Sequence, residues 1–188
     1  ADYAKAHGGA LPAGLVLALA AFFAALFVRA PFDVIGKIYT MAPTLVDHPE
    51  DIPAAVEEML RYNTAFIAMR RTATQDIEWQ GYRFNKGDKI VMHYHAVNHD
   101  EDVFGDDALS SDIHRMKRMP TLNREIRSFG IGQHFCLGIN LARLEMRIMF
   151  EELLPRLRNP RLAGDITYMR SFFISTIKAM PIEFTPER

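Results

Sequence analysis

The stretch best suited to chemistry is residues 129–138, which holds the only cysteine of the chain, Cys136, together with three glycines. Because glycine tolerates positive φ and close approach of other groups, this stretch can bend tightly around Cys136 and leave its sulfur facing a flat, bulky partner. A helical pattern follows directly, in which apolar residues recur at steps of four, three and four: Leu137, Leu141, Leu144 and Ile148.

Cys136 is therefore predicted at a helix N-terminus, where unpaired N–H groups and partial positive charge stabilise a thiolate. A thiolate held in this way suits a soft metal ion. The alternative is that Cys136 is an ordinary small buried residue, the common fate of a free cysteine. We favour the ligand role, because packing alone needs no glycine-rich bend at the start of a helix.

The pattern Phe-Gly-x-Gly-x-His-x-Cys-x-Gly, followed by Leu-Ala-Arg-Leu-Glu, resembles the haem-binding loop and following helix of bacterial cytochrome P450 enzymes. All five defining positions of the loop are filled, by Phe129, Gly130, Gly132, Cys136 and Gly138. The resemblance implies that Cys136 is the axial thiolate ligand of the iron of haem b, in a pocket that this loop forms. It also implies that His134 donates to a haem propionate, with ordinary packing as the alternative.

Length and composition set the frame for this resemblance. At 188 residues the chain can bury a good core as one domain, and its net charge of −1 argues against a nucleic-acid-binding surface. A single cysteine excludes an internal disulfide framework, which fits a reducing compartment and an expected cytoplasmic location. The resembled family is typically about twice as long and the match lies in its C-terminal half, so we expect a fragment or a truncated relative.

The expected fold is mainly α with a small antiparallel β-sheet, like the C-terminal portion of the resembled family. We divide the chain into a divergent apolar helix region, residues 1–50, and a haem-binding domain, residues 51–188.

The first of these regions contains residues 10–28, which carry no charge and reach the threshold length for a membrane span. We favour a helix buried on all sides, corresponding to the central helix that crosses the haem in the resembled family. That helix carries an acid and an alcohol that feed protons to bound dioxygen. The best local match makes Asp33 the catalytic acid but places Val34 at the alcohol, which puts proton delivery in doubt. Alternatively, Pro31 ends the helix and Asp33 caps the next element.

Glu58 and Arg61 lie three residues apart on a predicted helix that begins near Asp51 and Pro53, so they share a face. In the resembled family a Glu-x-x-Arg helix buries such an ion pair behind the haem, and on that ground both residues are assigned to the cofactor site. The alternative is an exposed surface pair. The third member of the family's network, an arginine, is not obvious before the loop, where Arg115 is a possible stand-in.

Alternating apolar residues punctuated by glycine turns predict antiparallel strands between residues 68 and 94. In register with the resembled family, Arg71 would contact a haem propionate, because a guanidinium fork suits a carboxylate. The alternative is that Arg71 is solvated, since Arg70 beside it could serve instead.

Two apolar segments are candidates to contact substrate. Phe66 and Ile67 would line the substrate side of the iron if the register above holds. The C-terminal hairpin resembles the segment that touches substrate in bacterial members acting on steroids or terpenoids, which adds Phe172 and Phe173. The alternative for the hairpin residues is ordinary core packing.

A different metal chemistry is conceivable at His93, His95 and His99. Alternate histidines on a strand point to one face and could bind zinc or iron without haem. Only Asp100 offers a carboxylate at a suitable spacing, so we expect ordinary surface or core histidines instead.

The resemblance implies a haem-thiolate monooxygenase that hydroxylates an apolar small molecule, such as a steroid, a terpenoid or an alkyl chain, with dioxygen. No flavin or nicotinamide fingerprint is present, so electrons would come from a separate ferredoxin or flavoprotein reductase. A basic run could dock an acidic donor, with solvated surface as the alternative: Arg115, Lys117, Arg118, Arg124 and Arg127. Two other classes stay open, a catalytically silent haem-binding fragment and a membrane-anchored module.

Overall fold

The computed structural model describes residues 41–171, 173–174 and 176–185. Three predictions concern residues outside this part of the chain: the apolar helix at residues 10–28, the catalytic acid Asp33 and the substrate contact Phe172. Among the helices that are described, none is long and apolar enough to cross a membrane.

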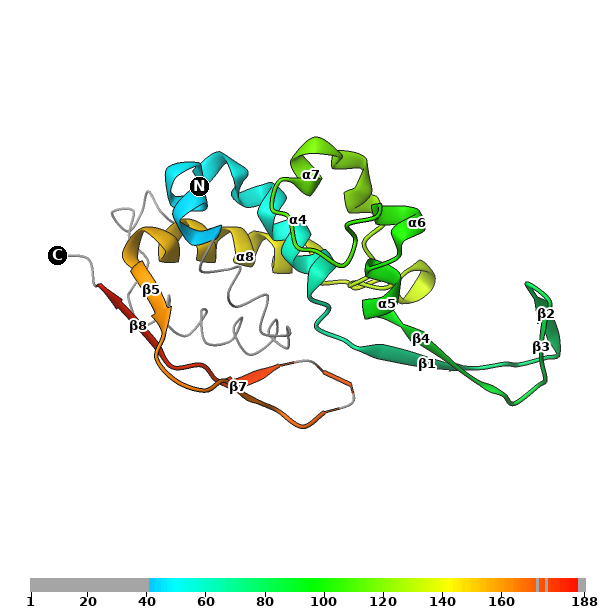
Figure 1. The fold of residues 1–188 in the computed structure, drawn as a ribbon. Helices are drawn as coiled ribbons and strands as arrows, with labels where there is room; N and C mark the ends of the chain where they lie inside the picture. The colour runs from blue at the N-terminus through cyan, green and yellow to red at the C-terminus, as the bar shows by residue number, and fades with distance from the viewer. Residues whose placement is uncertain (1–40, 172, 175, 186–188) are drawn as a thin grey trace.

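The two longest described helices, α4 (Ile52–Tyr62) and α8 (Ile139–Leu153), pack against each other and build the main core (Figure 1). Pro53 stands in the first turn of α4, where no intrahelical partner is needed for its missing N–H. The buried side of α4 also packs against residues 41–47, which are helical. Met146 and Phe150 are the residues of α8 that enter this core.

Short helices fill the connections, including the segment 101–127 that lacks a clear periodicity in the sequence. A second apolar cluster, which includes Phe104, Met116 and Ile126, holds this segment together. The short elements are η1 (Pro49–Asp51), α5 (Tyr94–Asn98), α6 (Glu101–Phe104), α7 (Arg115–Arg118), η2 (Pro120–Arg124), η3 (Gly132–His134) and η4 (Leu154–Arg156).

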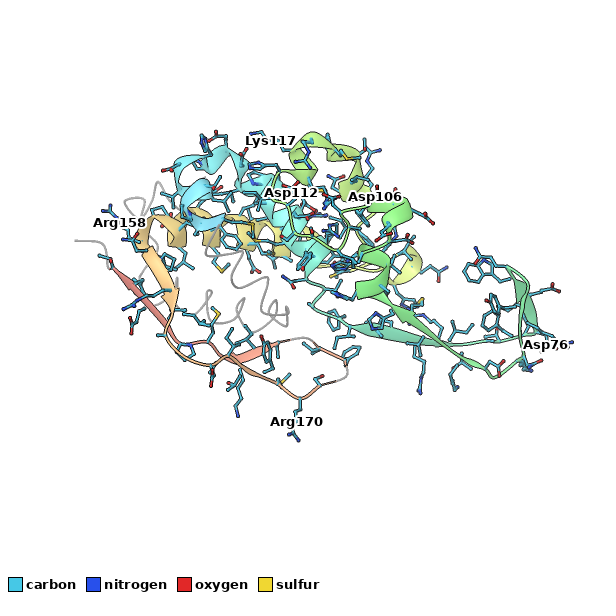
Figure 2. The ribbon with its side chains drawn as sticks, in the orientation of Figure 1. Asp76, Asp106, Asp112, Lys117, Arg158 and Arg170 are labelled. Atoms are coloured by element: carbon cyan, nitrogen blue, oxygen red, sulfur yellow. The ribbon has the colours of Figure 1, made fainter. Side chains whose placement is uncertain are left out.

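The mainly α fold with antiparallel strands is confirmed, but the described strands form separate two-stranded pairs rather than one sheet. The pairs are β1 (Ala68–Thr72) with β4 (Lys89–His93), β2 (Ile77–Trp79) with β3 (Tyr82–Phe84), β5 (Arg158–Leu162) with β8 (Ile182–Thr185), and β6 (Thr167–Tyr168) with β7 (Ile177–Ala179). Figure 1 shows β1 and β4 running outward from the helices to the β2–β3 hairpin, where Figure 2 places Asp76.

The strand expected to reach residue 94 ends at His93, and Tyr94 begins α5. The ring of His93 accepts a hydrogen bond from the amide of Ala96 at 3.3 Å, so it caps this helix. His93 and His95 therefore do not share one face of a strand, and the geometry behind the non-haem metal interpretation is wrong. Within the described residues, no three His, Cys, Asp or Glu side chains are placed to hold a metal ion.

Candidate functional site

The bend in residues 129–138 depends on glycine at two positions. Gly130 and Gly132 have φ of +77° and +73°, a conformation that L side chains rarely adopt. A Cβ on Gly130 would also stand 3.4 Å from the hydroxyl of Tyr94, so the loop lies close against α5. These two positions keep the loop compact and leave one side of it free of side chains.

Cys136 lies just ahead of α8, with Gly138 as the N-cap and Ile139 as the first helical residue. A backbone hydrogen bond closes the loop, in which the amide of Cys136 donates to the carbonyl of Phe129 at 3.0 Å. Cys136 is exposed, and a Cβ on Gly138 would come within 3.9 Å of its sulfur. The sulfur is therefore available to a ligand, which excludes the alternative of an ordinary buried cysteine.

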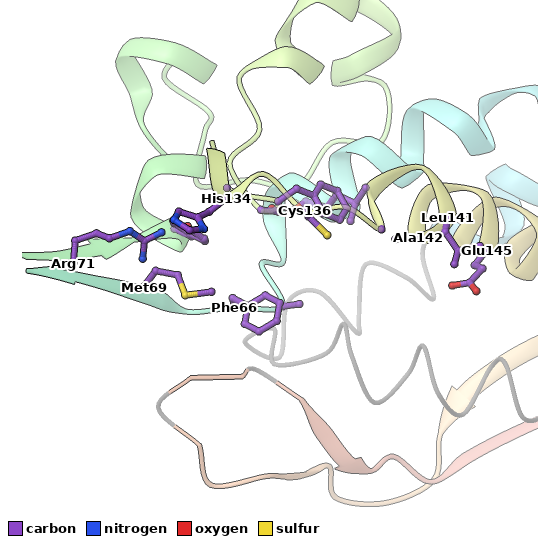
Figure 3. Close-up of a pocket in the computed structure, with 15 residues that line it drawn as sticks. Phe66, Met69, Arg71, His134, Cys136, Leu141, Ala142 and Glu145 are labelled. Atoms are coloured by element: carbon purple, nitrogen blue, oxygen red, sulfur yellow. Dashed lines mark hydrogen bonds between the residues drawn. The ribbon is translucent and has the colours of Figure 1, made fainter. Parts of the chain in front are cut away.

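A cavity of about 320 Å³ opens beside Cys136. Figure 3 shows the sulfur of Cys136 directed from the loop toward the side where Phe66 and Met69 lie. The lining is mostly apolar and combines residues before and within β1, the loop and the first two turns of α8. The predicted site residues that line it are Phe66, Arg71, Phe129, Gly130, His134, Cys136 and Gly138.

One end of this cavity is cationic and polar. Figure 3 shows Arg71 and His134 together at the end opposite Leu141 and Glu145, and Tyr94 also lines the cavity. Arg71 is exposed, and its guanidinium donates only to the carbonyl of the preceding residue at 3.1 Å among the bonds described. A soft sulfur donor, apolar walls and a cationic end together fit a flat apolar macrocycle that carries carboxylates, such as haem.

The two apolar segments predicted to contact substrate lie side by side. The rings of Phe66 and Phe173 are 5.0 Å apart, and the amide of Ile67 donates to the carbonyl of Phe173 at 3.0 Å. Phe66 also forms an isolated bridge with Ile174. Of these residues, Phe66 lines the cavity, whereas Ile67 and Phe173 support it from behind in the described structure.

Glu58 and Arg61 form a fully buried ion pair, which excludes the exposed alternative. The guanidinium of Arg61 grips both carboxylate oxygens of Glu58 at 2.7 and 2.8 Å. It also donates to the carbonyls of Asn98, Ala108 and Ser110 at 2.7 to 2.8 Å. In the described part of the chain neither member of the pair lines the cavity, so the pair fixes the backbone around the site rather than touching a ligand.

Arg115 completes this network, so the structure confirms it as the stand-in for the third member. Its Nε lies 3.3 Å from Oε1 of Glu58, and its other nitrogens donate to Asp107 and to the carbonyl of Phe104. Burial opposes its charge, but the carboxylates of Asp107 and Glu58 raise the pKa of Arg115. The same contact lowers the pKa of Asp107.

A second buried link, which the sequence analysis missed, ties the loop to α4 through Asn98. The side-chain amide of Asn98 donates to Ser128 Oγ at 2.7 Å, and Ser128 donates in turn to the carbonyl of Leu60. The side-chain oxygen of Asn98 accepts from the amide of Arg127 at 2.7 Å. The residues that precede Phe129 are thus held at fixed positions.

Residues 130, 131 and 135 of the loop also line a second hollow, a groove of about 480 Å³. The one carboxylate in its described lining is that of Glu57. The lining also contains four arginines: Arg124, Arg127, Arg143 and Arg147. Nε of Arg147 is buried and has no hydrogen-bond partner in the described structure. The groove therefore presents a cationic surface next to Phe135 and Ile131, which are exposed.

The histidines near α5 stack on one another instead of facing a metal. The rings of His95 and His99 are 4.1 Å apart, and His99 also lies 5.0 Å from the ring of Tyr62. Burial is the main cause that lowers the pKa of His99 to about 4, and nearby positive charge acts in the same direction. Both histidines are therefore neutral at pH 7 and belong to the packing behind the site.

Comparison with known proteins gives one consistent family. The family model described as Cytochrome P450 matches residues 51–160. The steroid C26-monooxygenase of Mycolicibacterium smegmatis is 42% identical over 144 residues, which are 76% of this chain and 34% of that protein. The linalool 8-monooxygenase of Pseudomonas putida is 35% identical over 143 residues, 76% of this chain and 34% of that protein.

Solved structures agree with this result. The Tepidiphilus thermophilus P450 heme domain superposes with a TM-score of 0.71 at 35% identity, over 81% of this chain and 36% of that one. The chain thus spans about a third of the length of the curated relatives that it matches.

Proposed function

The chain belongs to the cytochrome P450 family, and from this membership we propose that it holds a haem for the monooxygenation of an apolar small molecule. The observation that carries the proposal is the single cavity that joins an exposed cysteine sulfur, apolar walls and a cationic end. Haem held there supplies dioxygen activation and the insertion of one oxygen atom into a C–H bond.

Cys136 is the proposed axial thiolate ligand of the iron of haem b, since its sulfur faces the cavity from a glycine-rich loop. Arg71 and His134 would hold the propionates, because a guanidinium fork and an imidazole N–H both donate to carboxylates. Tyr94 lines the cavity with them and adds a hydroxyl donor. Arg70 does not line the cavity in the described structure, which favours Arg71 as the propionate contact.

Glu58, Arg61 and Arg115 would act as positioning residues. Their shared network fixes the carbonyls of segments 98–110 against α4, and the Asn98 link extends this rigidity to the start of the loop. A buried network of this kind specifies geometry more than it adds stability.

Phe66 is the proposed contact to the substrate, with Ile67 and the hairpin residues Phe172 and Phe173 in support. An apolar wall of this composition binds an apolar molecule. The names of the relatives reported above make steroids and terpenoids the substrates to test first, and alkyl chains stay in the proposed class. Asp33 remains the proposed acid for proton delivery, and the lone cysteine supports the proposed cytoplasmic location.

A ferredoxin or a flavoprotein reductase is the proposed electron donor. The groove with four arginines is lined in part by residues 130, 131 and 135 of the Cys136 loop, so an acidic donor protein seated there would approach the haem across this loop. Such docking is electrostatic and should weaken as salt is raised.

The test is turnover of the full chain, loaded with haem and supplied with a surrogate ferredoxin and its reductase. With a steroid or an acyclic terpenoid under labelled dioxygen, we expect one labelled oxygen atom in the product, and none with Cys136→Ser. A second candidate, a catalytically silent haem protein, is favoured by the exposed apolar face of α8, because Leu141, which lines the cavity, is itself exposed to solvent. It predicts haem uptake without a labelled product.

A further inference from the structure

Arg143, on α8, lines the groove and contacts Phe129, a residue that lines the cavity. Its Nε and Nη2 donate to the two carboxylate oxygens of Glu57, each at 2.7 Å. Cζ of the same guanidinium lies over the ring of Phe129, 5.3 Å from the ring centre. Arg143 and Glu57 line the groove, whereas Phe129 lines the cavity.

The guanidinium therefore contacts the carboxylate of Glu57 and the ring of Phe129 at the same time. The bidentate bond to Glu57 fixes the plane of the group, because two parallel N–H···O contacts leave little rotational freedom. A fixed plane can then hold an aromatic ring by cation–π attraction, which is strengthened where both groups are partly buried. Glu57 is buried and Arg143 is half-buried, so solvent competes only weakly with either contact.

The backbone of Phe129 is in turn hydrogen-bonded to that of Cys136. The carbonyl of Phe129 accepts the amide hydrogen of Cys136 at 3.0 Å, and its ring packs against the main core. A shift of the ring would therefore move the carbonyl and, through it, the backbone of the cysteine.

We propose that Arg143, oriented by Glu57, is a positioning residue that fixes the Phe129 ring and thereby the place of the Cys136 sulfur. The haem part of this inference rests on the proposed function, but the effect on the sulfur does not, since it concerns the chain alone. Arg147 is the natural control, because it lies one turn further along α8, lines the same groove and has no described contact with Phe129.

The first test uses the full chain without added haem. Cys136 is the only cysteine, so the rate of its reaction with iodoacetamide reports directly on its surroundings. We expect Arg143→Gln to change this rate about three- to tenfold, the range that loss of one partly buried cation–π contact allows. Arg147→Gln, which removes the same charge from the same helix, should leave the rate within about twofold.

A double-mutant cycle separates the ring contact from the loss of charge. In a Phe129→Leu background, Arg143→Gln should add no further change to the rate. Glu57→Gln should change the rate of the iodoacetamide reaction in the same direction as Arg143→Gln, but by a smaller factor. Equal rates for the Arg143 and Arg147 variants, or an Arg143 effect that persists in Phe129→Leu, would overturn the proposal.

The same variants loaded with haem give a second readout, the midpoint potential of the iron. The Arg143 variant should shift this potential more than the Arg147 variant does, and the excess should vanish in Phe129→Leu. A chain that takes up no haem would sink the proposed function, while the iodoacetamide cycle would still decide the role of Arg143.

Discussion

The two sides of the Cys136 loop are built in opposite ways. Behind the loop, Glu58, Arg61 and Arg115 are buried, and their charged groups are bonded to one another or to carbonyls. On the other side, α8 presents an apolar stripe to solvent. Leu144 in this stripe is 53% exposed. Leu137, Leu141 and Ile148 belong to the same exposed stripe.

The contrast separates two parts of the site: the buried polar network that positions Cys136, and the apolar surface that lines the cavity. The polar groups of the scaffold that positions the cysteine find partners within residues 57–128 and on α8. The cavity, by comparison, has an exposed apolar margin on α8. Substitutions on the two sides should therefore have unequal effects.

The largest effect is expected from Glu58→Gln. This change leaves the buried guanidinium of Arg61 without a counter-charge and Arg115 with that of Asp107 alone, which costs about 3–5 kcal/mol of unfolding free energy. Glu183→Gln, which breaks an exposed pair with Arg161, should cost less than about 1 kcal/mol. Urea unfolding measures both, and equal costs would contradict the asymmetry.

A pair of changes on one helix sharpens the same comparison. Phe150 is buried and Leu144 is exposed, although both are apolar residues of α8. We expect Phe150→Ala to lower the unfolding free energy by about 3 kcal/mol and Leu144→Gln to change it by less than about 0.5 kcal/mol. A large cost for Leu144→Gln would mean that this face is covered in solution.

The loop itself is tested by Gly130→Ala. The φ of +77° and the hydroxyl of Tyr94 at 3.4 Å both oppose a side chain here, so we expect a loss of about 1–2 kcal/mol. Haem titration should show weaker binding as well, because the strain falls on the loop that carries Cys136. The paired variant Tyr94→Phe removes the crowding hydroxyl oxygen, so it should recover part of the loss if the contact contributes.

Lowering the pH should reduce the unfolding free energy through His99. Folding lowers its pKa from 6.5 to about 4. Well above pH 6.5 the ring is neutral in both the folded and the unfolded chain, so it makes no pH-dependent contribution to stability there. Between pH 6.5 and 4 only the unfolded chain takes up the proton, and stability should drop by about 1 kcal/mol at pH 5 after solvent screening. His99→Gln should flatten this slope. The lowered carboxyl pKa values of Asp107 and Asp112 act only at lower pH.

The smallest effect is expected at the exposed cationic end of the cavity. Arg71→Gln should weaken haem binding about threefold, because a charge-assisted bond to a propionate is partly screened by water. Arg70→Gln serves as the matched control and should leave the affinity unchanged. If both variants bind haem equally well, Arg71 is not the propionate contact.

Local patterns identified the parts of the site that lie close together in the sequence. Glycine spacing around Cys136 predicted the bend, and the i,i+3 spacing predicted the pairing of Glu58 with Arg61. Arg115 could be named only as a possible stand-in, because its contact with Glu58 spans 57 positions and depends on where α7 is placed. Such long-range pairs leave no periodic trace in one sequence.

Two further limits have physical causes. Periodicity identified the apolar stripe of α8, but it reports that a face is apolar and not what covers it. The alternate spacing of His93 and His95 suggested one strand, whereas His93 ends β4 and caps α5. A strand-to-helix junction interrupts the period of two without changing the residue types.

The most direct test of the account is the absorption spectrum of the full chain, loaded with haem, reduced with dithionite and exposed to carbon monoxide, beside Cys136→Ser. We predict a Soret band moved far to the red in the unchanged chain and absent from the variant, because a thiolate donates electron density to the iron. A band that is the same in both proteins, or no uptake of haem by either, would contradict the assignment of Cys136 as the iron ligand.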